Sequence, residues 1–161
     1  MKEAISLDFY GTVVFEDGES IERISKIIQD TGEVKDISEV GSYWWNEFYN
    51  VFVNAYGETF RTQRDIEMQS LAKTIEHFKS SADAVQLSNE MFEYWQKPPI
   101  FEEAKQFFEQ CPVPIYIVSN IDTEDITEAI KFHGLTPAAV FTSEDAKSYK
   151  PRKELFEYAL K

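Results

Sequence analysis

Residues 4–12 read Ala-Ile-Ser-Leu-Asp-Phe-Tyr-Gly-Thr, and this stretch decides the fold class. Its apolar start shows little alternation, which is typical of a strand buried on both faces of a parallel sheet. Asp8 follows at the carboxyl end of that strand, where open α/β sheets bind their ligands. Gly11 permits a sharp turn there, and the Thr12 hydroxyl can brace the Asp8 side chain. The stretch therefore predicts a functional carboxylate at a strand end.

Two later segments repeat the apolar, strand-like pattern. They are residues 114–118 and 138–141, and helical patterns follow them at 123–133 and 153–160. A further helical pattern, over 102–110, precedes the second strand. Strands that alternate with helices form parallel sheets with right-handed crossovers. We therefore predict an α/β fold with a Rossmann-like parallel sheet.

A long block between the first two strands has no strand pattern. Residues 19–96 show four helical patterns, and short linkers containing glycine or proline flank the block. An all-helical module inserted into an α/β domain through two linkers resembles a cap on a hinge. The predicted domains are a Rossmann-like core of residues 1–16 and 98–161 and a helical cap of residues 17–97.

Polar residues also follow the second and third predicted strands. Ser119 and Asn120 end the second strand, directly before a helix N-terminus that offers amide donors to an anion. Lys150 follows the third strand and precedes Pro151, which stiffens the chain there. Together with Asp8, these groups suit a carboxylate nucleophile that attacks a centre carrying negative charge.

At this point the sequence resembles the haloacid dehalogenase-like (HAD) hydrolase superfamily. The helical block lies where that family inserts a helical cap, and the motifs follow in the family's order and spacing. The matching residues are Asp8, Tyr10, Gly11 and Thr12 after the first strand, Ser119 and Asn120 after the second, and Lys150 with Pro151 after the third.

The resemblance implies a catalytic role for four residues. Asp8 would be the nucleophile and would form a covalent aspartyl intermediate that water later hydrolyses. Thr12 and Ser119 would hydrogen-bond the nucleophile or the transferring group. Lys150 would stabilise charge on Asp8 and on the substrate.

The resemblance also implies contacts to substrate and metal. Tyr10, Gly11 and Asn120 would contact the substrate. In the phosphatase members, Mg2+ is held by the nucleophile, here Asp8, by the backbone carbonyl at the position of Tyr10, and by a later acidic motif. The dehalogenase members need no metal.

Tyr10 departs from the phosphatase pattern, because most of those enzymes have an aspartate there as general acid and base. A phenol with a pKa near 10 is poorly suited to protonate a leaving group at neutral pH. Tyrosine at this position is typical of the 2-haloacid dehalogenases. Those enzymes, however, have an arginine after a tryptophan early in the cap and a tyrosine six residues after the lysine. Here these positions hold Asn46 and Phe156.

Three functions therefore stay open. The favoured one is a phosphatase that acts on a small phosphorylated metabolite with Mg2+. The first alternative is a metal-free 2-haloacid dehalogenase, and the second is a catalytically silent binding module.

The family's acidic fourth motif and two further strands of its sheet are not found within residues 1–161. Strand 4–8 is therefore expected at a sheet edge, where unpaired backbone groups offer a route to oligomerisation. We expect that the chain is a C-terminally truncated piece of a longer protein and that residues 1–161 alone are weakly active or inactive.

Composition narrows the partners and the location. The 161 residues contain 16 Lys and Arg against 29 Asp and Glu, for a formal charge of −13. Such acidity argues against nucleic-acid and anionic-membrane partners and leaves a small anionic substrate bound locally by Lys150. Cys111 is the only cysteine, which excludes an internal disulfide and fits a cytoplasmic location.

Two further patterns receive structural interpretations. We interpret Asp122 and Asp125 as acids in the first turn of a helix rather than metal ligands. The aromatic stripe predicts mainly core residues, with one or two members facing the cleft between cap and core. Its members are Trp44, Trp45, Phe48, Tyr49, Phe52 and Tyr56.

Overall fold

The core of the protein is a small parallel sheet, which confirms the predicted fold class. A computed structural model describes residues 3–161. The sheet has three strands in the order β1-β2-β3, and both pairings are parallel. The strands are β1 (Ile5–Leu7), β2 (Ile115–Ser119) and β3 (Ala139–Thr142).

Strand β1 lies at one edge of this sheet, as the sequence predicts. The pairing of Leu7 with Ile117 fixes the register of β1 against β2. Because the strands run in parallel, this register brings Asp8 beside Val118, one residue before Ser119. The carboxyl ends of the strands therefore meet at one edge of the sheet.

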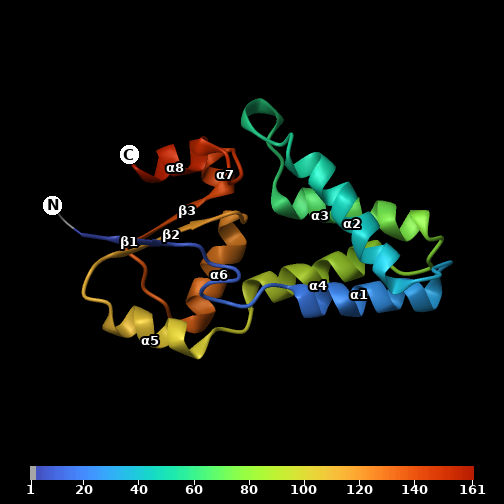
Figure 1. Cartoon of the computed structure of the whole chain (residues 1–161), viewed down its shortest axis with the longest axis horizontal. Coiled ribbons are helices and arrows are strands. Elements are labelled where there is room, and N and C mark those ends of the chain that lie inside the picture. The colour runs from blue at the N-terminus through green and yellow to red at the C-terminus, as the bar shows by residue number, and fades with distance from the viewer. Residues whose placement is uncertain (1–2) are drawn as a thin grey trace.

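Helices cover the two faces of the sheet (Figure 1). Ile117 is fully buried in the apolar cluster that also contains Ile126 of α6. Tyr116 and Val118 point to the opposite face, where they line an apolar hollow together with Phe156 of α8. The core helices are α5 (Glu102–Gln110), α6 (Thr123–His133), α7 (Ser143–Ala146) and α8 (Lys153–Ala159).

The elements between β1 and α5 are all helical and form a separate group beside the sheet (Figure 1). Side chains cap three of the helices: Asp36 accepts from Ser38 N, Thr62 from Asp65 N, and Asp83 from Val85 N and Gln86 N. The elements are α1 (Gly18–Thr31), α2 (Ile37–Phe52), a 3-10 turn η1 (Gly57–Thr59), α3 (Gln63–His77) and α4 (Ala84–Gln96). We call α1–α4 the cap.

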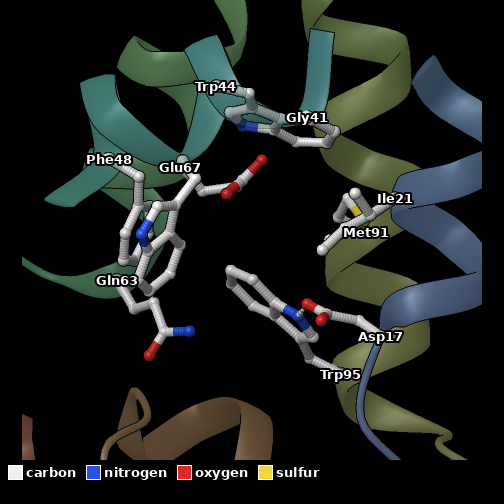
Figure 2. Close-up of a pocket in the computed structure, with 10 residues that line it drawn as sticks. Asp17, Ile21, Gly41, Trp44, Phe48, Gln63, Glu67, Met91 and Trp95 are labelled. Carbon is white, nitrogen blue, oxygen red and sulfur yellow. Dashed lines mark hydrogen bonds between the residues drawn. The ribbon is translucent and has the colours of Figure 1, made fainter. Parts of the chain in front are cut away.

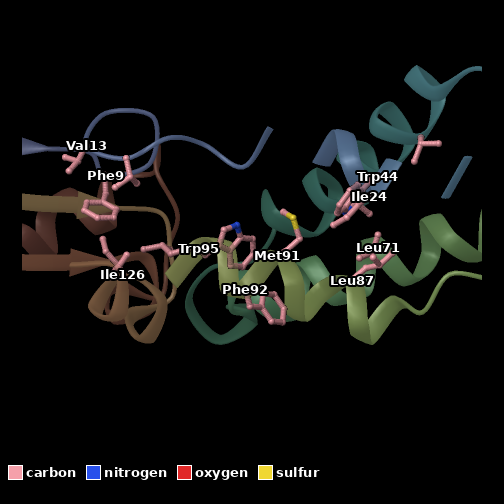
Figure 3. Packing of buried hydrophobic residues seen from close by; sticks show 14 of the residues in the cluster. Phe9, Val13, Ile24, Trp44, Leu71, Leu87, Met91, Phe92, Trp95 and Ile126 are labelled. Atoms are coloured by element: carbon pink, nitrogen blue, oxygen red, sulfur yellow. The ribbon is translucent and has the colours of Figure 1, made fainter. Parts of the chain in front are cut away.

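Cap and core share one continuous apolar cluster (Figure 3). Phe9 and Ile126 lie at its core end, Trp95 lies in the middle, and Met91 and Leu71 lie in the cap. Fully burying a large apolar side chain contributes about 1.5–3 kcal/mol. The cap is thus packed on the core through buried side chains, in addition to its two linkers.

Within residues 3–161, no helix is both long enough and apolar enough to cross a membrane.

Candidate active site

Asp8 and Lys150 form an ion pair at the carboxyl edge of the sheet. The Lys150 Nζ atom lies 2.9 Å from Asp8 Oδ1, and it also donates to the Val118 carbonyl at 2.8 Å. The Asp8 side chain is 47% exposed, whereas that of Lys150 is 18% exposed. A carboxylate that a reagent can reach is thus paired with an ammonium group held largely out of water.

The backbone of Lys150 is fixed from the core side by Asn120. The Asn120 Oδ1 atom accepts from Lys150 N at 2.7 Å, and its Nδ2 atom donates to the Lys150 carbonyl at 3.0 Å. We predicted Asn120 as a substrate-binding residue. In the structure its amide is engaged with the Lys150 backbone, so it positions the lysine.

The residue before Lys150 is held from the cap side. Tyr149 is 2% exposed and stacks near the rings of Phe52 and Phe60, and its hydroxyl donates to the Arg61 carbonyl at 2.7 Å. The cap therefore helps to place Lys150. Nothing in the sequence around Tyr149 indicates this contact, because its partners lie about 90 residues earlier in the chain.

The turn after Asp8 explains the glycine in the first motif. Gly11 has a φ of +82°, and a Cβ atom there would lie 2.7 Å from Glu16 Oε1. The amides of Thr12 and Val13 both donate to the Phe9 carbonyl, which closes the turn. Thr12 is exposed in this turn, whereas Ser119, at the end of β2, is 1% exposed.

Tyr10 links the turn to the cap. Its hydroxyl donates to the Trp95 carbonyl of α4 at 2.5 Å. Burial, followed by the nearby charge of Asp125, raises the pKa of this phenol well above its ordinary value. Tyr10 therefore keeps its proton at neutral pH and uses it in a structural hydrogen bond, so it is not a general acid or base.

A second polar contact between cap and core involves the two aspartates of α6. The Asp122 carboxylate accepts from Gln63 N at 2.8 Å and from Arg64 N at 2.9 Å, so it caps the cap helix α3. Arg64 also donates from Nε to Asp125 Oδ2 at 2.9 Å and pairs with Oδ1 through Nη2. Burial raises the pKa of Asp122 to about 6. Asp122 and Asp125 lie at the start of α6, as expected, but their carboxylates also bind groups of the cap helix α3.

No protein-family model and no curated protein matches the sequence. Solved structures do match. L-2-haloacid dehalogenase from Xanthobacter autotrophicus has a TM-score of 0.70 and 17% identity, and the match covers 99% of this chain and 64% of that enzyme. The defluorinating L-2-haloacid dehalogenase has a TM-score of 0.74 and 16% identity, and the match covers 98% of this chain and 67% of that enzyme. The HAD-hydrolase YfnB from Bacillus subtilis, bound to magnesium, has a TM-score of 0.70 and 16% identity. That match covers 98% of this chain and 72% of YfnB.

The chain has the haloacid dehalogenase-like fold. This confirms the resemblance that the three sequence motifs indicate. The chain spans 64% of the length of the Xanthobacter enzyme. At 16–17% identity the match establishes the fold, so the chemistry has to be argued from the residues of the site.

Two positions distinguish this HAD-like chain from the dehalogenase pattern described above. Asn46 replaces the expected arginine and is exposed on α2. Phe156 replaces the expected tyrosine, is 46% exposed, and lines the apolar hollow on the sheet. Neither side chain supplies a cation or a hydroxyl to Asp8.

The predicted magnesium ligands are Asp8 and the Tyr10 carbonyl. Over residues 3–161, no group of three or more His, Cys, Asp or Glu side chains could hold a metal ion. Mg2+ is usually bound by one or two carboxylates together with substrate phosphate oxygens and water. The accessible Asp8 carboxylate can be one such ligand, so Mg2+ would need substrate phosphate oxygens and water beside it.

A cavity of about 170 Å³ lies among the cap helices (Figure 2). It is lined by Trp95, whose carbonyl accepts from the Tyr10 hydroxyl. Trp44 is 4% exposed and Trp95 is 3% exposed, and both line it. The aromatic stripe is thus core at Trp44, but the prediction is wrong for three other members. Trp45, Tyr49 and Tyr56 are 59%, 47% and 42% exposed.

Sequence reasoning missed the most unusual residue of this cavity, Glu67. It is 5% exposed, and its Oε1 atom has no hydrogen-bond partner among the described residues. Burial, followed by the charge of Asp17, raises the pKa of Glu67 to about 8. A signal existed in the sequence: Glu67 lies four residues before Leu71 on the buried face of α3.

We expect Glu67 to make stability depend on pH. An unfolded glutamic acid releases its proton near pH 4.5, whereas folded Glu67 keeps it up to about pH 8. The folded state therefore binds more protons in this window, and the free energy of unfolding falls as the pH rises through it. Glu67→Gln removes this dependence. The stability of this variant relative to the unchanged protein should rise by on the order of 4 kcal/mol across the window.

Urea unfolding followed by circular dichroism, at about pH 5 and about pH 9, measures this difference. The matched control is Glu76→Gln, because Glu76 is exposed on the same helix. The relative stability of the control should not change with pH. If the stability of Glu67→Gln relative to the unchanged protein is also the same at both pH values, the assignment of a buried, protonated Glu67 is wrong.

Proposed function

We propose that this protein is a hydrolase in which Asp8 is the nucleophile. The observation that carries the proposal is the 2.9 Å pair between Lys150 Nζ and Asp8 Oδ1, with Asp8 accessible at the edge of a HAD-like sheet. An ammonium partner lowers the energy of a centre that gains negative charge. Asp8 would attack the substrate, the leaving group would depart, and water would then hydrolyse the aspartyl ester or anhydride.

The remaining site residues have supporting roles in this proposal. Thr12 and Ser119 would hydrogen-bond the transferring group. Gly11 would let the backbone approach it closely. Asn120 would keep Lys150 within reach of Asp8, since both of its amide atoms bind the Lys150 backbone.

The favoured substrate class is a small phosphorylated metabolite. Asp8 and the Tyr10 carbonyl would hold Mg2+, which would neutralise phosphate charge when bound, and YfnB supports this reading as a HAD-hydrolase bound to magnesium. Since the Tyr10 hydroxyl is bound to the Trp95 carbonyl, residue 10 cannot protonate the leaving group. We therefore propose a phosphorylated substrate whose leaving group departs as a stable anion, such as an aryl or acyl phosphate.

The second candidate is 2-haloacid dehalogenation, and Tyr10 favours it. Halide leaves as a stable anion without a proton, so this reaction does not need a general acid at residue 10. L-2-haloacid dehalogenases are also prominent among the similar structures. Against it, Asn46 stands where those enzymes bind the substrate anion.

The test compares both reactions on the purified intact protein. For a phosphatase, we expect phosphate release from p-nitrophenyl phosphate only with Mg2+, and at least about 100-fold slower release from an alkyl phosphate, because no general acid is present. Metal-independent halide release from 2-chloropropionate would move the assignment to the dehalogenase. Inactivity in both assays, with native circular dichroism, would favour the silent binding module.

A further inference from the structure

The cap cavity brings together every tryptophan of the protein. The sequence contains three tryptophans, and Trp44, Trp45 and Trp95 all line the cavity. Phe48 contributes a further ring (Figure 2). The faces of such rings carry a partial negative charge and attract cations within about 6 Å.

Among the described residues, the ionisable side chains that line the cavity are both carboxylic acids, Asp17 and Glu67. Glu67 points into the space between the Trp44 and Trp95 rings (Figure 2). Asp17 stands at the rim and accepts from Trp95 Nε1 at 2.9 Å. No Lys, Arg or His belongs to the lining among the residues that the structure describes.

Glu67 is the observation that indicates a ligand. It is 95% buried, since its exposed fraction is 5%, and its Oε1 atom has no partner within residues 3–161. A buried polar atom without a partner destabilises a fold by about 1–3 kcal/mol, so such atoms usually have a purpose. A ligand that brings a positive charge and N–H or N–CH groups would satisfy Oε1.

We propose that this cavity binds a small organic ammonium ion, with its charge against Glu67 and its alkyl groups against the tryptophan rings. Aromatic walls with an acidic group suit ammonium ligands because they provide both cation–π attraction and a counter-ion. The volume of about 170 Å³ also fits, since a cavity of about 150 Å³ can hold benzene. This inference goes beyond the proposed function, and it can be tested without any catalytic activity.

Binding should release a proton from Glu67. The groups that face Glu67 are Asp17, directly before α1, the Trp44 indole from α2 and the Trp95 ring from α4. The pKa of Glu67 is about 8, so its carboxyl group is largely protonated at lower pH. A cation prefers the ionised carboxylate, so its affinity should rise by at least about tenfold between about pH 6.5 and pH 8.5. A neutral ligand that accepts the Glu67 proton would instead bind more weakly as the pH rises.

Tryptophan fluorescence is the direct readout, because all three fluorophores surround the cavity. The probes are tetramethylammonium, choline and 3,3-dimethyl-1-butanol, the uncharged isostere of choline. We expect saturable quenching by both cations and at least about tenfold weaker binding of the isostere at about pH 8.5. Isothermal calorimetry gives an independent affinity and, in buffers of different ionisation enthalpy, the number of protons released.

Two substitutions test the role of the carboxylate. Glu67→Gln keeps the shape of the side chain and should weaken choline at least about tenfold and remove the pH dependence. Glu76→Gln removes the same charge from an exposed position of α3 and should leave binding unchanged. If Glu67→Gln does not fold, Trp44→Leu, which removes one ring and keeps the charge, should also weaken choline relative to the isostere.

The proposal fails if neither cation binds in fluorescence and calorimetry, or if choline and its isostere bind equally at about pH 8.5. It also fails if affinity falls as the pH rises, because the ligand would then prefer a protonated Glu67. None of these measurements depends on whether Asp8 is catalytic. A failure here and a failure of the proposed function can therefore be told apart.

Discussion

We expect Asp8→Asn to reduce hydrolysis at least about ten-thousand-fold, whichever substrate class the protein uses. Asparagine has nearly the same shape as aspartate, but its amide is not a nucleophile. It also removes the negative partner of Lys150, whose Nζ atom lies 2.9 Å from Asp8 Oδ1. Initial rates with p-nitrophenyl phosphate and Mg2+, and with 2-chloropropionate, measure the loss.

Thermal melting checks that the Asp8→Asn variant is folded, which we expect because Asp8 is exposed. The matched control is Asp30→Asn, because Asp30 is an exposed acid on α1 that forms a surface ion pair with Lys26. Its activity should stay within about twofold, because exposed pairs contribute little. A folded Asp8→Asn protein with undiminished activity would exclude Asp8 as the nucleophile.

The second large effect is expected from Arg64→Leu, which should lower the free energy of unfolding by about 3–5 kcal/mol. Arg64 pairs with Asp125, whose side chain is fully buried. Removing the guanidinium leaves a buried carboxylate without its positive partner. Because Arg64 belongs to the cap and Asp125 to the core, the substitution also weakens the contact between them. Urea unfolding followed by circular dichroism measures the change.

Two further variants make this prediction specific. Arg23→Leu removes an exposed arginine of the cap that pairs with Glu90, and it should cost no more than about 1 kcal/mol. The double variant Arg64→Leu/Asp125→Leu should be more stable than Arg64→Leu alone, because it leaves no unpaired buried charge. Equal losses for Arg64→Leu and Arg23→Leu would show that the Arg64 pair does not hold cap and core together.

Much of the fold and part of the site can be predicted from the sequence for a local reason. Short apolar runs, helix periodicity and capping residues are set by neighbours a few positions away, so the strands and cap helices are readable from the chain. Asp8 follows β1 directly and Ser119 ends β2, whereas Lys150 comes after β3 and the short helix α7. Parallel strands place their carboxyl ends at one edge, so the topology brings Asp8 and Ser119 together. Contacts of Asn120 and of Tyr149 place Lys150 beside them.

The roles of Tyr10, Arg64 and Glu67 depend on contacts that no local pattern encodes. Tyr10 meets Trp95 across 85 positions, and Arg64 meets Asp125 across 61. Glu67 is unusual only because the helices packed around it remove it from water and leave Oε1 without a partner. The sequence by itself determined a HAD-like sheet with an aspartate at its edge. The packing of cap on core decided which of its polar residues hold the two parts together and which face a cavity, because burial and pairing arise only between segments distant in the chain.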